Sequence, residues 1–246
     1  MIVTLPNNTY GRFTSFDFTE SEINSLSQGL DYSFFASNKK FPILSNLEII
    51  EKQSAWVKIL ESEEKQIASF QPTCRNEVRR SLKSAEISIE INTTPIEELF
   101  SFHKQCETER NWFPVPPQEL ESSLVICVRY LDELIAGMTA YYYKDFLRVG
   151  RIFSSRKSLK YQNLQQVVFS SASRRVVYEL TRWGFKNGFK YLDLGGITLE
   201  EESKSGITKF KLSFGSEIIP MYLGRKSDSN FDLLNEYCKN NNFDLT

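Results

Sequence analysis

Two short stretches decide the fold of this chain. The first, Tyr191-Leu192-Asp193-Leu194-Gly195-Gly196, has the apolar character of a buried strand and ends in an aspartate and two glycines. The second, Gly206-Ile207-Thr208-Lys209-Phe210-Lys211-Leu212-Ser213-Phe214-Gly215-Ser216-Glu217, covers most of a predicted short helix, residues 205–214, and leads into a predicted strand, residues 217–223. Ligands gather at strand ends in open α/β sheets, so we expect a site beside Asp193.

The residues before these stretches predict a sheet and a long helix. Residues 124–130, 134–143 and 146–154 have the composition of strands, and the short turn-like segments between them predict an antiparallel meander. Gly137 within the second run predicts a bulge or a close approach of another group to the backbone. Residues 165–187 carry apolar side chains at helical spacing, and Gly188 follows as the expected residue past the helix end.

Farther upstream, helical and strand patterns alternate. We expect a helix that Thr73 caps, a strand over residues 87–91, and a second helix that begins at the capping box Thr94-Pro95-Ile96-Glu97 and ends near Asn111. Adjacent prolines make residues 112–117 a stiff aromatic loop. Residues 1–60 are poorly patterned, and the remaining expectations are short strands over residues 33–36 and 41–44 and a closing helix over residues 230–240.

Composition limits the partners of the protein. The chain has 246 residues, of which 41% are hydrophobic and 25% charged, and this globular composition excludes a collagen-like or wholly disordered chain. Its 30 basic and 31 acidic residues give a net charge of −1, so no global basic field draws it to nucleic acid. We expect one folded domain over residues 1–246 and no DNA partner.

The single histidine and the four cysteines exclude several kinds of site. His103 alone cannot form a multi-histidine metal site, and its place on the apolar side of a predicted helix indicates a core residue. The cysteines are widely separated, which favours buried thiols in a reducing compartment over a disulfide framework. No signal peptide and no transmembrane segment is apparent, so a cytoplasmic protein without a bound metal is expected.

The two stretches quoted first resemble the carboxyl-terminal signature of the FemAB-like acyltransferases, D-x-G-G followed by G-x-x-x-F-K-x-x-F-G. Residues 75–83 are similar to the basic R-x-x-x-R-R helix of that family, and residues 110–120 are similar to its arginine and proline-rich loop. The resemblance spans residues 70–220 and implies the GNAT-type N-acetyltransferase fold, a mixed α/β fold with a central, mostly antiparallel sheet flanked by helices. The chain lacks the length for the two complete domains of the cell-wall members.

The resemblance also implies which residues act. It places the lysine of the F-K pair at Lys211, where a cation can stabilise the negative charge that develops during amide formation. Asp193 either serves as a general base or acceptor contact, or caps the turn that follows it. The arginines expected to bind the donor are Arg75, Arg79 and Arg80.

Acceptor and donor contacts are expected in three further places. Arg110, Trp112 and Phe113 are candidates for an acceptor wall, and Tyr142 is a candidate general acid or a packing residue of its strand. Acetyl-CoA enzymes of this fold carry a glycine-containing loop before the long helix. Residues 154–163 stand there without a glycine, so Arg156 and Lys157 would have to meet phosphates by their side chains.

These observations predict an N-acyltransferase that acts on an amine of a cell-envelope sugar or peptide precursor. The resemblance implies an acyl-CoA or an aminoacyl-tRNA as co-substrate, and no other cofactor is expected. Two alternatives stay open. One is an aminoacyl-tRNA-dependent peptidoglycan ligase, which would bind tRNA, and the other is a catalytically silent domain that keeps the fold for binding.

Overall fold

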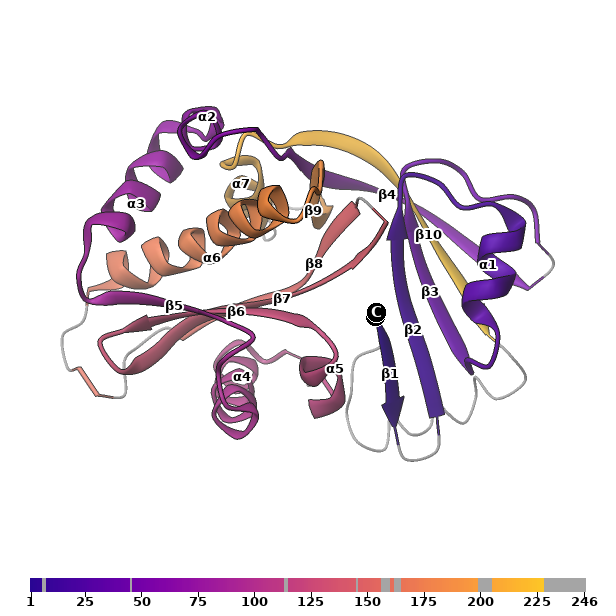
Figure 1. Ribbon diagram of the computed structural model, residues 1–246, viewed down its shortest axis with the longest axis horizontal. Coiled ribbons are helices and arrows are strands. Elements are labelled where there is room, and N and C mark those ends of the chain that lie inside the picture. The colour runs from indigo at the N-terminus through magenta and orange to yellow at the C-terminus, as the bar shows by residue number, and fades with distance from the viewer. Residues whose placement is uncertain are drawn as a thin grey trace.

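The meander, the long helix and the two signature stretches lie where the sequence predicts them. The computed structural model describes residues 1–5, 8–44, 46–112, 115–144, 146–155, 160–161, 165–198 and 205–227 (Figure 1). The meander, the long helix and the signature stretches comprise β6 (Leu124–Tyr130), β7 (Glu133–Tyr143), β8 (Phe146–Ser154), α6 (Gln166–Lys186), β9 (Tyr191–Ile197), α7 (Ser205–Leu212) and β10 (Glu217–Ser227). The helix expected over residues 205–214 therefore ends two residues early, and the closing helix expected over residues 230–240 lies outside the described residues.

The chain up to residue 121, including the poorly patterned residues 1–60, also folds into regular elements. They are β1 (Ile2–Leu5), β2 (Asn8–Ser15), α1 (Glu20–Ser27), β3 (Tyr32–Ser37), β4 (Leu47–Lys58), α2 (Glu63–Ser69), α3 (Pro72–Lys83), β5 (Ile87–Ile91), α4 (Ile96–Arg110) and α5 (Pro117–Glu121). The strands expected over residues 33–36 and 87–91 are confirmed. The strand expected over residues 41–44 is wrong, because that segment lies between β3 and β4 without a strand partner.

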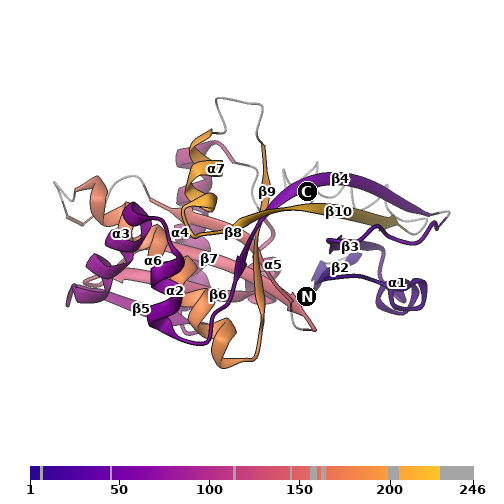
Figure 2. The same ribbon diagram turned by 90° about the horizontal axis from the view of Figure 1, so that it is seen from above.

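The strands form one mixed sheet in the order β1-β2-β3-β10-β4-β9-β8-β7-β6-β5. Only the β2/β3 and β8/β9 pairs are parallel, and the other neighbours run antiparallel. β4 and β10 pair over most of their length and connect the two halves of the sheet, as the view from above shows (Figure 2). A mostly antiparallel central sheet flanked by helices confirms the expected mixed α/β fold.

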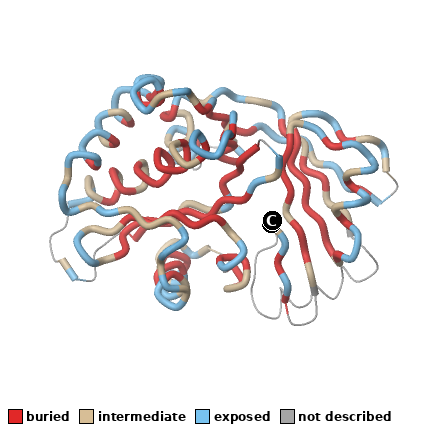
Figure 3. The backbone as a smooth tube through the Cα atoms, viewed as in Figure 1, coloured by how far each residue is buried: buried red, intermediate tan, exposed pale blue. Residues whose placement is uncertain are grey.

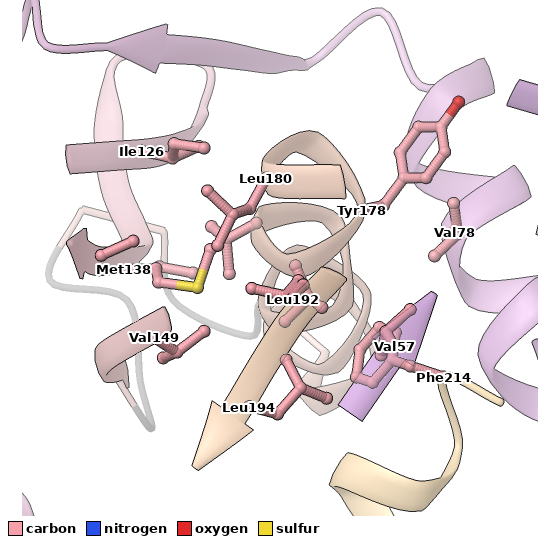
Figure 4. Close-up of a cluster of buried hydrophobic side chains, with 14 of the residues drawn as sticks. Val57, Val78, Ile126, Met138, Val149, Tyr178, Leu180, Leu192, Leu194 and Phe214 are labelled. Carbon is pink, nitrogen blue, oxygen red and sulfur yellow. The ribbon is translucent and has the colours of Figure 1, made fainter. Parts of the chain in front are cut away.

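Alternation along the meander divides the core between the two faces of the sheet. In β6, Leu124, Ile126 and Val128 belong to one buried cluster, which includes residues of α3 and α6, while Val125 and Cys127 belong to another with residues of α4 and α5. The buried residues follow the sheet and the inner sides of the helices (Figure 3). The first cluster, shown in Figure 4, also holds strand β9 in place through Leu192 and Leu194.

Two expected helix caps are wrong. Helix α3 begins at Pro72, with Gln71 as the N-cap residue and no side-chain cap, so Thr73 lies inside the first turn. Helix α4 has Pro95 at its N-cap, and the Thr94 hydroxyl instead donates to Glu90 Oε2 at 2.6 Å. In contrast, the predicted close approach at Gly137 is confirmed, because a β-carbon there would lie 2.4 Å from the Phe153 ring.

Gly215, in the second signature stretch, provides a test of the packing between α7 and α2. Its φ is +66°, and a β-carbon would lie 2.3 Å from the Ser69 carbonyl oxygen, which is backbone. We expect Gly215→Ala to lower the free energy of unfolding by more than the ~1–2 kcal/mol of left-handed strain alone. Urea denaturation measures the loss. Gly188→Ala is the matched control, with φ +78° and open space, and an equal loss in both variants would contradict the close contact.

Candidate active site

A cavity opens where the parallel strands β8 and β9 separate. Their pairing covers only residues 146–148 of β8 and 191–193 of β9, and both strands continue beyond it. The cavity has a volume of about 930 Å³, and Val149 and Leu194, the next residue of each strand, line it. Helices α6 and α7 supply further walls, and both lie beside this part of the sheet (Figure 1).

The wall of this cavity combines apolar side chains with cations. Its apolar residues include Val149, Ile152, Phe169, Leu194, Ile207 and Phe210. Its cations are Arg110, Arg151, Arg174 and Lys211, and none of its described lining residues is a carboxylate. Two of these arginines form ion pairs with carboxylates that do not line the cavity: Arg151 with Glu107, and Arg174 with Glu77. The arrangement suits a ligand that has both an apolar and an anionic part.

Lys211 is the cation nearest the carboxyl end of β9. It lies on α7, half-buried, and its Nζ donates to the carbonyl oxygen of Gly196 at 2.7 Å. Burial lowers the pKa of Lys211 from 10.5 to about 8, against the opposing effect of Asp193, which raises it. The amine is therefore mostly protonated at neutral pH but close to the range in which it loses its charge.

Asp193 lies behind the cavity wall and is fully buried. Leu192 and Leu194 point into the core cluster, so alternation directs Asp193 to the other face of the sheet. There Arg148 forms an ion pair with Oδ2, while the Ser54 hydroxyl and the Gly195 amide, the latter at 2.7 Å, donate to Oδ1. A catalytic role for Asp193 stays a prediction, and these contacts favour a role in positioning because both carboxylate oxygens are engaged.

Two of the expected acceptor residues lie in the same cavity as Lys211. Arg110 ends helix α4 and donates from Nη2 to the Ser154 hydroxyl at 2.9 Å. The guanidinium carbons of Arg110 and Arg151 lie 5.0 and 5.6 Å from the ring centroid of Trp112. Arg110, Trp112 and Lys211, distant in sequence, therefore line one cavity. Phe113 lies outside the described residues.

Four expected site residues that the structure describes, Arg75, Arg79, Arg80 and Tyr142, do not line this cavity. Arg75 donates to the Phe70 carbonyl oxygen at 3.0 Å, and Arg79 and Arg80 are exposed on α3. Tyr142 is exposed at the far end of β7, where its ring packs against Trp183 and Phe189. Arg156 and Lys157 lie outside the described residues. Roles for these side chains in donor or acceptor binding stay predictions.

The sequence interpretation missed Arg148 and Ser54, which hold Asp193, and Arg151 and Arg174, which line the cavity. A signal for Arg148 was present, because it is a lone charge within the apolar run Phe146-Leu147-Arg148-Val149. Charged residues are almost never fully buried without a partner. Nothing in the sequence indicated that this partner is Asp193.

The described residues that the sequence assigned to the core are buried, while Cys238 lies outside the described residues. His103 is 1% exposed and lies against the Phe153 ring, with Nδ1 3.1 Å from Glu107 Oε1. Cys74, Cys106 and Cys127 are buried free thiols, and burial raises the pKa of each. Within the described residues, no helix has both the length and the apolar character needed to cross a membrane.

Comparison with known proteins supports the fold. A scan against protein-family models and a search of curated proteins found no match. Among solved structures, FemX is similar over 90% of this chain and 82% of its own, with 9% identity and a TM-score of 0.59. L-PGS from Bacillus licheniformis is similar over 95% and 82%, with 12% identity and a TM-score of 0.55.

A third structure is the C-terminal domain (DUF2156) of a predicted lysylphosphatidylglycerol synthetase from Agrobacterium fabrum. It covers 97% of this chain and 84% of its own, with 14% identity and a TM-score of 0.57. At such identities the likeness shows a shared fold. The expected FemAB-like resemblance is therefore confirmed for the fold, and the activity is a separate question.

Proposed function

We propose that this chain is an N-acyltransferase that moves an acyl or aminoacyl group from an activated donor to an amine of a cell-envelope sugar or peptide precursor. The observation that carries the proposal is the position of Lys211, a half-buried cation on the wall of a cavity of about 930 Å³ between two separating strands. We propose further that residues 1–246 act as one domain, since one sheet contains all ten described strands.

Amide formation needs the features that this cavity offers. The amine attacks the acyl carbonyl, whose oxygen gains negative charge, and a cation held in a water-poor site stabilises that charge without reorganising. Apolar side chains such as Phe169 and Phe210 line the cavity and can hold the acyl part. Two reactants held together in one cavity also react more readily than two that meet in solution.

The structural neighbours support a transferase and an envelope acceptor. FemX and the lysylphosphatidylglycerol synthetase domain share the fold with this chain, and the second is named for making an aminoacylated lipid. For the donor we propose an acyl-CoA or an aminoacyl-tRNA. Arg151 and Arg174 on the cavity wall suit a donor that carries phosphates, and so does Arg110, which the sequence had assigned to the acceptor.

Calorimetric titration tests the proposal and separates the donors. The purified protein is titrated with acetyl-CoA and, in parallel, with bulk aminoacyl-tRNA at low salt, with deacylated tRNA as the control. Saturable binding of acetyl-CoA would support a CoA-dependent enzyme, and preference for charged tRNA would support an aminoacyl donor, with affinity that falls steeply as salt rises. Binding of neither would contradict the proposal and favour a catalytically silent binding domain.

A further inference from the structure

We infer that the buried ion pair between Arg148 and Asp193 positions Lys211, through the turn that Gly195 and Gly196 form at the end of β9. The inference deepens the proposed function, because it rests on Lys211 being the acting cation. Asp193 and Arg148 are then positioning residues, which need not touch a substrate. Their effect passes through a short series of contacts.

The ion pair lies at the point where the sheet opens. Arg148 and Asp193 are the last register partners of β8 and β9, and beyond them the two strands separate around the cavity. On the other side of β9, strand β4 contributes Ser54, whose hydroxyl donates to the same carboxylate. Side chains from both neighbouring strands thus hold Asp193 where the backbone ladder between β8 and β9 stops.

The backbone after Asp193 departs from a regular strand. Asp193 pairs with Trp56 and Gly196 with Ser54, so Leu194 and Gly195 together face the single residue Ala55. An extra residue of this kind bends a strand and changes the direction of the groups that follow. Gly195 has a φ of +85°, which favours glycine, and its amide donates to Asp193 Oδ1 at 2.7 Å. The carboxylate therefore holds the bend in place.

The bend sets the position of the lysine. The carbonyl oxygen of Gly196, the next residue, accepts from Lys211 Nζ at 2.7 Å. A β-carbon on Gly195 would lie 3.5 Å from the same Nζ, so the amine rests directly on the turn. The contacts run from Arg148 and Ser54 to Asp193, then through the two glycines to Lys211.

The charges around Lys211 are consistent with positioning as the main effect of the ion pair. Asp193 raises the pKa of Lys211 and Arg148 lowers it, so the two charges oppose each other there. Arg110, Arg151 and Arg174 are the further charged groups among the described residues that line the cavity. Removing both charges of the ion pair together should change the field at Lys211 less than removing either charge alone.

Two double variants separate position from charge. Arg148→Met with Asp193→Asn removes both charges but leaves an oxygen that can accept from the Gly195 amide. Arg148→Met with Asp193→Leu removes the charges and the acceptor. The readout is the rate at which acetyl N-hydroxysuccinimide ester acetylates Lys211 as a function of pH, measured by peptide mass spectrometry in the free protein, with exposed Lys209 as internal reference.

We expect the Asn variant to keep the low midpoint of the Lys211 profile and the Leu variant to move that midpoint to higher pH. Equal profiles in the two double variants would overturn the inference. If the Leu variant fails to fold, Gly195→Ala disturbs the turn directly, with Gly188→Ala as a control of similar backbone strain and no contact with Lys211. An unchanged Lys211 profile in Gly195→Ala would likewise overturn it.

These measurements use no substrate, so they do not depend on the proposed function. A shifted Lys211 profile in a protein that binds neither acetyl-CoA nor aminoacyl-tRNA would uphold the positioning and contradict the acyltransferase. If the protein binds a donor but the variants leave the Lys211 profile unaltered, the acyltransferase proposal would stand and the positioning inference would be overturned.

Discussion

Replacement of Lys211 by alanine is expected to lower kcat by about 10²–10³-fold, the cost of losing one preorganised group that stabilises an oxyanion. KM for the donor should change much less, because Arg110, Arg151 and Arg174 remain in the cavity. Steady-state kinetics with the donor identified by titration measures both constants. Lys209→Ala is the matched control, since Lys209 is exposed on the same helix and should keep parent activity.

The pH dependence of kcat distinguishes a cation from a base at this position. With a pKa of about 8, Lys211 loses its charge as the pH rises through 8, so the parent protein should lose the proposed activity there. Lys211→Arg keeps its charge at every accessible pH and should show a flat profile over the same range. A parent activity that rises through pH 8 would show instead that the neutral amine acts as a base.

Breaking the buried contact between Arg12 and Glu119 should have a large effect on stability. Arg12 of β2 lies 3.3 Å from Glu119 Oε2 of α5, Tyr10 donates to the same oxygen at 2.6 Å, and the two charged side chains are 11% and 8% exposed. Glu119→Leu leaves the guanidinium buried without its carboxylate, which should lower the free energy of unfolding by about 3–5 kcal/mol.

Urea denaturation of three variants tests this expectation. The double variant Arg12→Met with Glu119→Leu should recover most of the loss, because an apolar pair of similar volume replaces a buried ion pair at little cost. Asp17→Ala breaks an exposed pair with Lys39, whose side chains are 53% and 67% exposed, and should cost less than about 1 kcal/mol. If Glu119→Leu lowers the free energy of unfolding no more than Asp17→Ala does, the buried contact between Arg12 and Glu119 does not stabilise the fold as expected.

Local periodicity explains why the sequence predicted so much of the fold. In the meander both faces of the sheet are buried or half-buried. Its strands are rich in β-branched and aromatic residues, so they can be recognised from composition alone, without knowledge of their partners. Residues 87–91, 124–130 and 146–154 were predicted with the bounds that the structure shows. Gly188 and Asn111 end their helices with φ of +78° and +53°, so these helix ends were also readable from local residue chemistry.

Non-local contacts explain what the sequence did not predict. β3 and β4 are separated in the sheet by β10, and no local pattern specifies a partner so distant in the chain. The site depends on the same kind of contact. Lys211 and Asp193 were recognisable from the signature, but the Arg148 and Ser54 contacts of Asp193 depend on which strands flank β9. Arg110 and Trp112 are far from Lys211 in the sequence, so no local pattern could predict that the three residues line one cavity.

The place of β10 between β3 and β4 has a consequence for how the chain folds on the ribosome. Tyr222 of β10 pairs with Ser37 of β3 on one side and with Glu51 of β4 on the other. β3 and β4 therefore have no partner along these edges until β10 has been synthesised. Until then the facing edges of β3 and β4 expose unpaired amides and carbonyls, which are templates for intermolecular pairing. Such long-range closure is slow. We therefore expect the nascent amino-terminal half to depend on chaperones and to aggregate when residues 217–227 are deleted.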